Sequence, residues 1–180
     1  VMDMSLARPA GALHVFDEHG LSAPRIDGLI TPNGLAFTAD GQGAWLSDSH
    51  PSVQQIWRLA RDPASGALSG RTPWVDMKPL PGRPDGAAVD EAGAYWICGN
   101  DAGLVHRFSP AGELVQSLAV PFPKPSMCCF GGPDLRTLFV ASIQPAVAPE
   151  ALGDSGALVA CEVGVAGRPE PRFTRFPPSD

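Results

Sequence analysis

The 180-residue chain has few basic residues and no cluster of them. Lys and Arg together number 13 against 19 Asp and Glu, which gives a net charge of -6 and a pI near 5.1. Surfaces that bind nucleic acid or anionic membranes depend on clustered cations. We therefore expect neither partner, whereas a small neutral or anionic molecule remains compatible with the composition.

Long hydrophobic runs and targeting signals are also missing. No apolar run approaches the ~20 residues of a membrane span, and the first residues lack the basic and apolar regions of a signal peptide. Cysteine is scarce, and two of the four cysteines, Cys128 and Cys129, are neighbours that would point to opposite faces of a strand. We expect four reduced thiols, inner-strand packing for this pair, and a cytoplasmic location.

No stretch has the apolar period of a long amphipathic helix. The 20 Gly and 20 Pro supply turns, while the 4 Trp and 8 Phe fall in short apolar runs. A Gly-rich phosphate cradle between a strand and a helix is absent as well, which gives little support to an oxidoreductase with a bound organic cofactor. The pattern predicts an all-β fold.

One phrase, however, occurs three times. Its copies begin at Pro32, Pro84 and Pro125, which places them 52 and 41 residues apart, near the period of a β-propeller blade. The second residue of each copy is polar: Asn33, Asp85 and Ser126. Equivalent positions of a radial repeat converge on its axis, so these residues predict a shared oxygen-rich site.

Runs typical of strands divide the chain into about three and a half blades. The expected units are the end of one blade at residues 1–32, blades at 33–80 and 81–122, and the last blade at 123–180. Closed propellers have about 4 to 8 blades. Because an open half-ring would leave long sheet edges, we expect missing N-terminal blades or a second chain to close it. Residues 11–17 are expected to form one outer strand, and the loop 143–153 to flank the pocket.

Asn33 and Asp85 both offer hard oxygen ligands, which suit Ca²⁺, Mg²⁺ or another divalent ion. The alternative is that Asn and Asp before Gly are ordinary turn formers, whose side chains bond to nearby backbone amides. Sequence spacing leaves both interpretations open.

Other reactive residue types have simpler explanations. Ser155 lies in a Gly-Asp-Ser-Gly sequence like a serine-protease nucleophile loop, but such a Ser needs a base and an orienting acid. None of the four histidines lies in a motif that would supply this base; they are His14, His19, His50 and His106. His50 is the better candidate to line a pocket because it follows Asp48, itself a candidate supporting acid. We expect Ser155 in a turn, His106 and His50 at the surface or in packing, and the tryptophans between sheets.

Three phrases together carry a family resemblance: Pro32-Asn33-Gly34-Leu35-Ala36-Phe37, Gly82-Arg83-Pro84-Asp85-Gly86-Ala87-Ala88-Val89-Asp90 and Cys128-Cys129-Phe130-Gly131-Gly132-Pro133-Asp134-Leu135. In order and spacing they resemble the gluconolactonase family, also called the senescence marker protein or regucalcin-like family. Its members are six-bladed β-propellers. The likeness runs from about Met2 to the C-terminus and corresponds to the C-terminal portion of that fold.

The resemblance implies a site. Family members bind one divalent cation at the axis through a Glu of the first blade, an Asn and an Asp, and many hydrolyse sugar lactones. By motif the Asn is Asn33 and the Asp is Asp85, which in the family is also the suspected proton-transfer group. The Glu has no counterpart here and is expected upstream of Val1. Ca²⁺ is the first choice of ion, with Zn²⁺, Mn²⁺, Mg²⁺ and Fe²⁺ as alternatives.

The implied function is a metal-dependent hydrolase that opens sugar lactones. A hard cation would polarise the lactone carbonyl and lower the pKa of a bound water, and Asp85 would accept a proton as that water attacks. Asn33 would be a neutral ligand. The alternative is a noncatalytic calcium-binding propeller, or an inactive fragment; a first-blade Glu in the full-length sequence would favour the enzyme.

Overall fold

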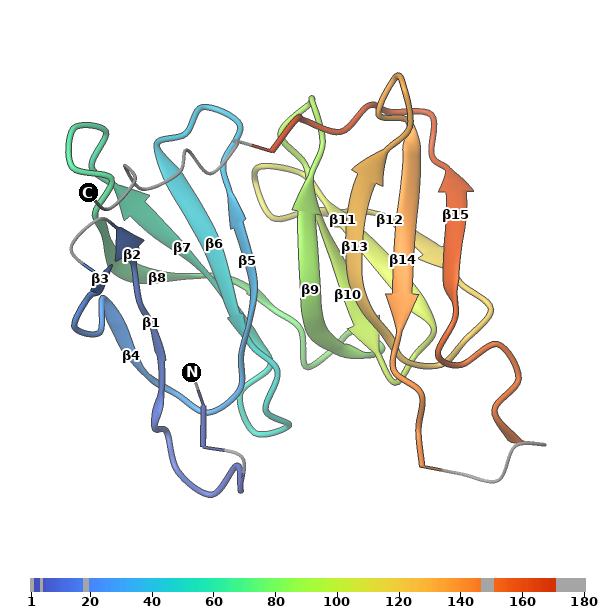
Figure 1. Cartoon of the computed structure of the whole chain (residues 1–180), viewed down its shortest axis with the longest axis horizontal. Helices are drawn as coiled ribbons and strands as arrows, with labels where there is room; N and C mark the ends of the chain where they lie inside the picture. The colour runs from blue at the N-terminus through green and yellow to red at the C-terminus, as the bar shows by residue number, and fades with distance from the viewer. Residues whose placement is uncertain (1, 4, 18–19, 147–150, 171–180) are drawn as a thin grey trace, which may run out of the picture.

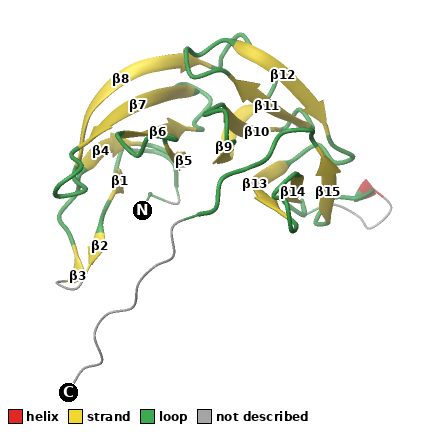
Figure 2. Cartoon of the chain, turned by 90° about the horizontal axis from the view of Figure 1, so that it is seen from above, coloured by secondary structure: helices red, strands yellow, loops and turns green. Residues whose placement is uncertain are grey.

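The computed structural model describes residues 2–3, 5–17, 20–146 and 151–170. This part of the chain is all-β with almost no helix, as predicted, and its antiparallel sheets follow one another in chain order along an arc (Figures 1 and 2). None of its helical segments reaches the length and apolarity needed to cross a membrane.

Two four-stranded sheets form the middle of the arc. The first contains β5 (Pro32–Phe37), β6 (Gly43–Asp48), β7 (Gln55–Arg61) and β8 (Leu68–Asp76), in that order. The second contains β9 (Arg83–Val89), β10 (Tyr95–Asn100), β11 (Leu104–Phe108) and β12 (Leu114–Ala119), again in chain order. Figure 2 shows β5 and β9 toward the concave side of the arc and β8 and β12 on its convex edge.

Smaller sheets stand at the two ends. One pairs β1 (Gly11–Leu13) with β4 (Ile26–Leu29), and the other contains β13 (Pro125–Gly131), β14 (Thr137–Ser142) and β15 (Leu158–Glu162). A separate hairpin joins β2 (Phe16–Asp17) to β3 (Gly20–Leu21).

The prediction of a single strand over residues 11–17 is wrong. The chain leaves the sheet after Leu13, and β2 begins only at Phe16. Ser22 explains the break, because its hydroxyl accepts the Val15 amide at 3.0 Å and its carbonyl oxygen lies 2.9 Å from Nδ1 of His14. Local side-chain hydrogen bonds of this kind compete with a sheet ladder.

The repeated phrase forms the same irregularity in all three inner strands. Each inner strand has a register shift at the phrase. In β5, paired with β6, it lies between Asn33 and Ala36, and in β13, paired with β14, between Pro125 and Met127. In β9 it lies opposite the stretch of β10 from Ile97 to Gly99. Proline has no amide proton to give to a ladder, so it suits the start of such a strand. A bulge re-aims the side chain that it carries, and here it falls at or beside Asn33, Asp85 and Ser126.

Aromatic side chains fill the space between neighbouring sheets. Trp45 of β6 lies 5.2 Å, between ring centroids, from both Trp74 and Tyr95, which joins the first four-stranded sheet to the second. Trp96 is fully buried and packs edge-on against Phe130 of the next sheet. Trp57 is partly buried against a third cluster around Leu29. The prediction that the tryptophans pack between sheets is therefore confirmed.

Trp96 also contacts the ion pair between Asp90 and Arg107. Oδ2 of the fully buried Asp90 accepts a hydrogen bond from Nε1 of Trp96 at 2.9 Å and lies 2.7 Å from Nη2 of Arg107. Oδ1 of Asp90 accepts the backbone amide of Ala94 at 2.9 Å. The carboxylate therefore has partners on both oxygens, as a buried charge requires.

Candidate metal and catalytic site

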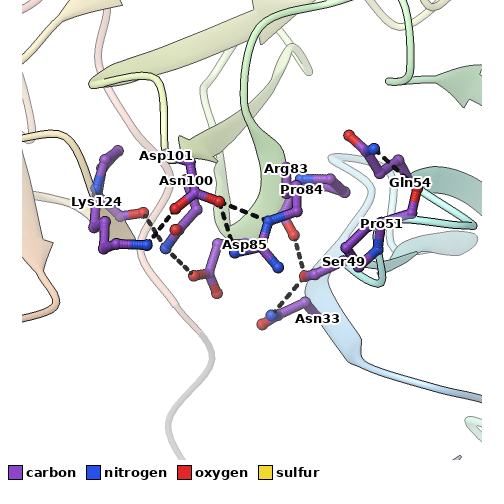
Figure 3. Close-up of polar contacts among 11 residues, drawn as sticks. Asn33, Ser49, Pro51, Gln54, Arg83, Pro84, Asp85, Asn100, Asp101 and Lys124 are labelled. Atoms are coloured by element: carbon purple, nitrogen blue, oxygen red, sulfur yellow. Dashed lines mark hydrogen bonds and ion pairs between the residues drawn. The ribbon is translucent and has the colours of Figure 1, made fainter. Parts of the chain in front are cut away.

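Polar side chains from both four-stranded sheets, together with Lys124 just before β13, surround one cavity of about 380 Å³. Its lining residues are Thr31, Asn33, Ser49, Arg83, Asp85, Asn100, Lys124, Ile143 and Pro145. The structure thus brings the two predicted ligands, Asn33 and Asp85, to the same cavity (Figure 3). Ile143 and Pro145 come from the loop that was expected to flank the pocket, and in the described residues they do so.

Asp85 stands at the bulge of β9 and is half-buried in this wall. Burial raises the pKa of its carboxyl group above the ordinary value, because the charged form loses solvation. A hydrogen bond from Asn100 acts in the opposite direction by stabilising the carboxylate, as do the Asn33 side chain and the charge of Arg83. Asp85 is therefore a carboxylate whose proton affinity is raised, which is the property that a general base needs.

Asn100 is a site residue that the sequence reasoning missed. It ends β10 with 4% of its surface exposed, and its Nδ2 donates to Oδ2 of Asp85 at 2.8 Å and to the carbonyl oxygen of Pro125 at 3.2 Å. Both partners accept hydrogen bonds, so this end of the amide must be the nitrogen. Oδ1 of Asn100 is then one of the buried side-chain atoms without a hydrogen-bond partner in the described part of the chain.

A signal for Asn100 does exist in the sequence. Asn100 follows Pro84 by the same 16 positions that separate Asp48 from Pro32, and each residue ends the second strand of its sheet. The polar strand end thus repeats together with the proline phrase. Treating strand-end polar residues only as turn formers concealed this second repeat.

Asn33 is oriented by a short hydrogen-bond relay. Its Nδ2 donates to Oγ of Ser49 at 2.8 Å, and the Ser49 hydroxyl donates in turn to the carbonyl oxygen of Pro84. The relay links β5 to β9 and leaves the amide oxygen of Asn33 as the atom to face a ligand. The turn-former interpretation, in which the Asn33 side chain bonds to nearby backbone amides, does not describe this geometry.

Gly34 allows the chain to pass behind Asn33. It has a φ of 59°, and a Cβ atom there would lie 2.5 Å from both Oγ of Ser47 and Oη of Tyr95. The Tyr95 hydroxyl instead donates to the carbonyl oxygen of Gly34 at 2.6 Å. Only glycine meets both the backbone and the space requirement.

Asp48 supports the site from behind rather than joining it. Its buried carboxylate accepts the backbone amides of Ile30, Thr31 and His50 at 2.7 to 3.0 Å. These bonds fix the segment that leads into β5 and hence the position of Asn33. Thr31 carries a second buried oxygen of this cavity wall, Oγ1, that has no hydrogen-bond partner among the described residues.

An ion-pair network borders the cavity beside Asp85. Nε and Nη2 of Arg83 lie 2.7 and 2.6 Å from Oδ2 of Asp101, and Nζ of Lys124 pairs with Oδ1 of the same carboxylate. Partial burial raises the pKa of Asp101, but the hydrogen bonds and charges of Lys124 and Arg83 outweigh it and hold the pKa below its ordinary value. Figure 3 shows Asp85 between Lys124 and Arg83 in this view.

The remaining candidates lie apart from the cavity or in ordinary structural roles. Ser126 donates to the carbonyl oxygen of Ala141 at 3.4 Å, and Nδ1 of His50 lies 2.7 Å from Oγ of Ser52; neither residue lines the cavity. His106 is fully buried, as expected for a packing residue. Ser155 lies in a turn, as predicted, while His19 is outside the described residues.

The cysteines are free thiols, as predicted. Cys128 is buried in an inner strand, but the expectation of the same role for Cys129 is wrong, because Cys129 is exposed. The two side chains point to opposite faces of β13, so only one of them can face the core.

The donor set fits a hard cation in part. Asp85 supplies a carboxylate, Asn33 an amide oxygen, and Asn100 a buried oxygen without a partner. These are the oxygen donors that Ca²⁺ and Mg²⁺ take. Within the described ranges, no group of three or more His, Cys, Asp or Glu side chains could hold a metal ion. A soft-metal centre is therefore not what this set of residues offers.

Comparisons with known proteins show the family to which the chain belongs. The family described as "SMP-30/Gluconolactonase/LRE-like region" matches residues 1–144. A 6-deoxy-6-sulfogluconolactonase of Pseudomonas putida is 37% identical over 164 residues, which cover 89% of this chain and 55% of that protein. A pentonolactonase of Haloferax volcanii is 32% identical over 167 residues, covering 89% and 57%. The chain thus spans about half the length of these curated relatives.

Solved structures support the same fold. A calcium-binding protein, regucalcin, of Agrobacterium tumefaciens superposes with a TM-score of 0.88 at 23% identity, over 97% of this chain and 59% of that one. The extent of the family match and the identity to the two lactonases settle the classification: the chain belongs to the SMP-30/gluconolactonase/LRE-like family.

Proposed function

We propose that this chain is part of a metal-dependent hydrolase that opens sugar lactones. One observation carries the proposal: Asp85, a carboxylate with raised proton affinity, shares a cavity with oriented amide oxygens of Asn33 and Asn100. The substrate class is supported by two relatives whose names describe them as sugar-lactone hydrolases.

The residues of this chain would act as follows. When bound, a divalent cation supplies electrophilic activation of the lactone carbonyl and of water. Asn33 and Asp85 would hold it, and Asn100 would keep Oδ2 of Asp85 in place. Asp85 accepts a proton from the attacking water, the water oxygen bonds to the carbonyl carbon, and the ring C–O bond breaks. The ring oxygen then takes a proton, so that lactone and water become one hydroxy acid.

The ring itself is also part of the proposal. We take the sheets as blades of a six-bladed propeller, with blades at residues 33–80, 81–122 and 123–180 and the end of another at 1–32. Further N-terminal blades, or a second chain, would close the ring and bring a Glu to the cation. The four free thiols support the cytoplasm as the location.

A hydrolysis assay on the completed ring tests the function. With glucono-1,5-lactone, we expect turnover that a chelator abolishes and that a divalent cation restores. Asp85→Asn keeps the shape of the side chain but removes the base, so kcat should fall by about 10²- to 10⁴-fold. Asp154→Asn, the same change in an exposed turn, is the control and should leave kcat unchanged.

Two results would contradict the proposal. Undiminished turnover by Asp85→Asn would remove Asp85 from the mechanism. Tight calcium binding without turnover of any sugar lactone would instead favour a noncatalytic calcium-binding propeller, and failure of both binding and turnover in the completed ring would indicate an inactive protein.

A further inference from the structure

Two cationic side chains border the cavity beside Asp85. Arg83 and Lys124 both line the cavity, and one carboxylate, Asp101, is their common partner. The chain has only two lysines, so placing one of them here is notable against a net charge of -6. These two cations balance the carboxylates of Asp85 and Asp101, so this border lacks the negative excess of the whole chain.

The two cations are held in place by a residue with a constrained backbone. Asp101 follows β10 directly and has a φ of 76°, a left-handed conformation that residues other than glycine rarely adopt. It joins Arg83, from β9, to Lys124, which lies just before β13 of the next sheet. The pairing therefore fixes cations from two sheets at one border of the cavity.

Asp101 does not use all the donors of these cations. It takes Nε and Nη2 of Arg83, whereas Nη1 is outside that pairing, and it takes one of the three N–H groups of Lys124. Each side chain is about one third exposed, with values of 34% and 33%. Donors thus remain for a small anion that enters from the cavity.

We propose that Arg83 and Lys124 form a subsite for an anionic substituent of the substrate, so that the preferred lactone carries a sulfonate, phosphate or carboxylate group. This inference rests on the proposed lactonase function and names the substrate class within it. Asp101 is a positioning residue that keeps both cations directed at the border of the cavity. A sulfonate or phosphate oxygen accepts the guanidinium and ammonium donors in charge-assisted hydrogen bonds.

A matched pair of substrates tests the subsite on the completed protein. The pair is glucono-1,5-lactone and its 6-deoxy-6-sulfo counterpart, which differ in one charged group. The ratio of kcat/KM for the sulfonated over the neutral lactone should fall about 10- to 100-fold in Lys124→Met, the loss expected for a hydrogen bond to a charged group. Lys124→Arg should keep the ratio, and Lys78→Met, at the other and exposed lysine, should change neither substrate.

A binding measurement tests the anion subsite independently of the proposed lactonase activity. Calorimetric titration with 6-deoxy-6-sulfogluconate and with gluconate measures the subsite even when neither lactone is hydrolysed. Weaker binding of the sulfonated acid by Lys124→Met and by Arg83→Met, relative to gluconate, supports the subsite. Equal losses for both compounds would overturn it and leave Arg83, Asp101 and Lys124 as a structural ion-pair network.

Discussion

Asn100 and Asp85 form one hydrogen-bonded unit, in which Nδ2 of Asn100 donates to Oδ2 of Asp85 at 2.8 Å across the bulge of β9. The second bond of the same nitrogen, to the carbonyl oxygen of Pro125, fixes the amide plane. The orientation of the carboxylate therefore depends on a residue 15 positions later in the chain.

Replacing Asn100 should impair catalysis without removing any group that attacks the substrate. In Asn100→Ala, Asp85 loses its donor and its fixed direction, so we expect kcat or metal affinity to fall by about 10- to 100-fold, as for other residues that orient a ligand. Calorimetric titration of Ca²⁺ and the lactone assay measure the two effects. Gln116→Ala, which removes an amide from exposed β12, is the control; wild-type values for both variants would contradict the role.

Asn33 can be tested by metal binding alone. Asn33→Ala removes the amide oxygen that faces the cavity, and the affinity of the completed ring for Ca²⁺ should fall by about tenfold or more. Ser49→Ala removes the hydroxyl that accepts from Asn33 and donates to the Pro84 carbonyl oxygen but leaves the amide oxygen of Asn33 in place, so a smaller loss is expected. An unchanged titration of Asn33→Ala would exclude Asn33 as a ligand.

Gly34 offers a test of space separate from backbone conformation. Gly34→Ala places a Cβ atom 2.5 Å from Tyr95 Oη, whereas Gly28 has a similar φ of 68° and nothing within 4 Å. Both substitutions carry the cost of a left-handed alanine. We expect Gly34→Ala to lower the free energy of unfolding by about 1–3 kcal/mol more than Gly28→Ala. Equal free energies of unfolding in urea titrations would show that Ser47 and Tyr95 move aside for the added methyl group.

His106 should make stability depend on pH. Burial lowers the pKa of its imidazole below the ordinary value of 6.5, although the hydrogen bond with the Pro81 carbonyl opposes this. The unfolded chain therefore binds the proton more readily, and the stability contributed above pH 6.5 is lost as the pH falls through the folded-state pKa.

The expected size is about 1.4 kcal/mol for each unit by which the pKa is lowered. Urea titrations at several values between pH 5 and pH 8 should show a smaller slope for His106→Gln than for wild type. His50→Gln, in the loop after β6, is the control. Parallel curves for wild type and His106→Gln would mean that His106 is not the group responsible.

The ion pair of Asp90 should matter for stability and not for chemistry. Asp90→Ala leaves Arg107 and the Trp96 indole without their buried partner, which should cost about 3–5 kcal/mol. Thermal unfolding measures the loss, with Asp154→Ala as an exposed control. A change of less than about 1 kcal/mol would show that water replaces the carboxylate.

The order of the sheets could be predicted from the sequence because each proline phrase starts an inner strand and each is followed by alternating apolar runs. The same repeat predicted Asn33 and Asp85 as site residues, and the two line one cavity. What the sequence hid were contacts between units. Arg83, Asp101 and Lys124 meet across two sheets, and no local period encodes that meeting. The strand expected at residues 11–17 failed for a local reason, since Ser22 binds the backbone that would have paired.

The repeated bulge separates the demands of folding from those of chemistry. A residue at a bulge is left out of the regular ladder, so the sheet places few restrictions on which side chain stands there. Asn33, Asp85 and Ser126 occupy equivalent bulges with three different functional groups. These positions are therefore suited to exchange, and a library varied at Ser126 could change the functional group at the third bulge with little risk to the fold.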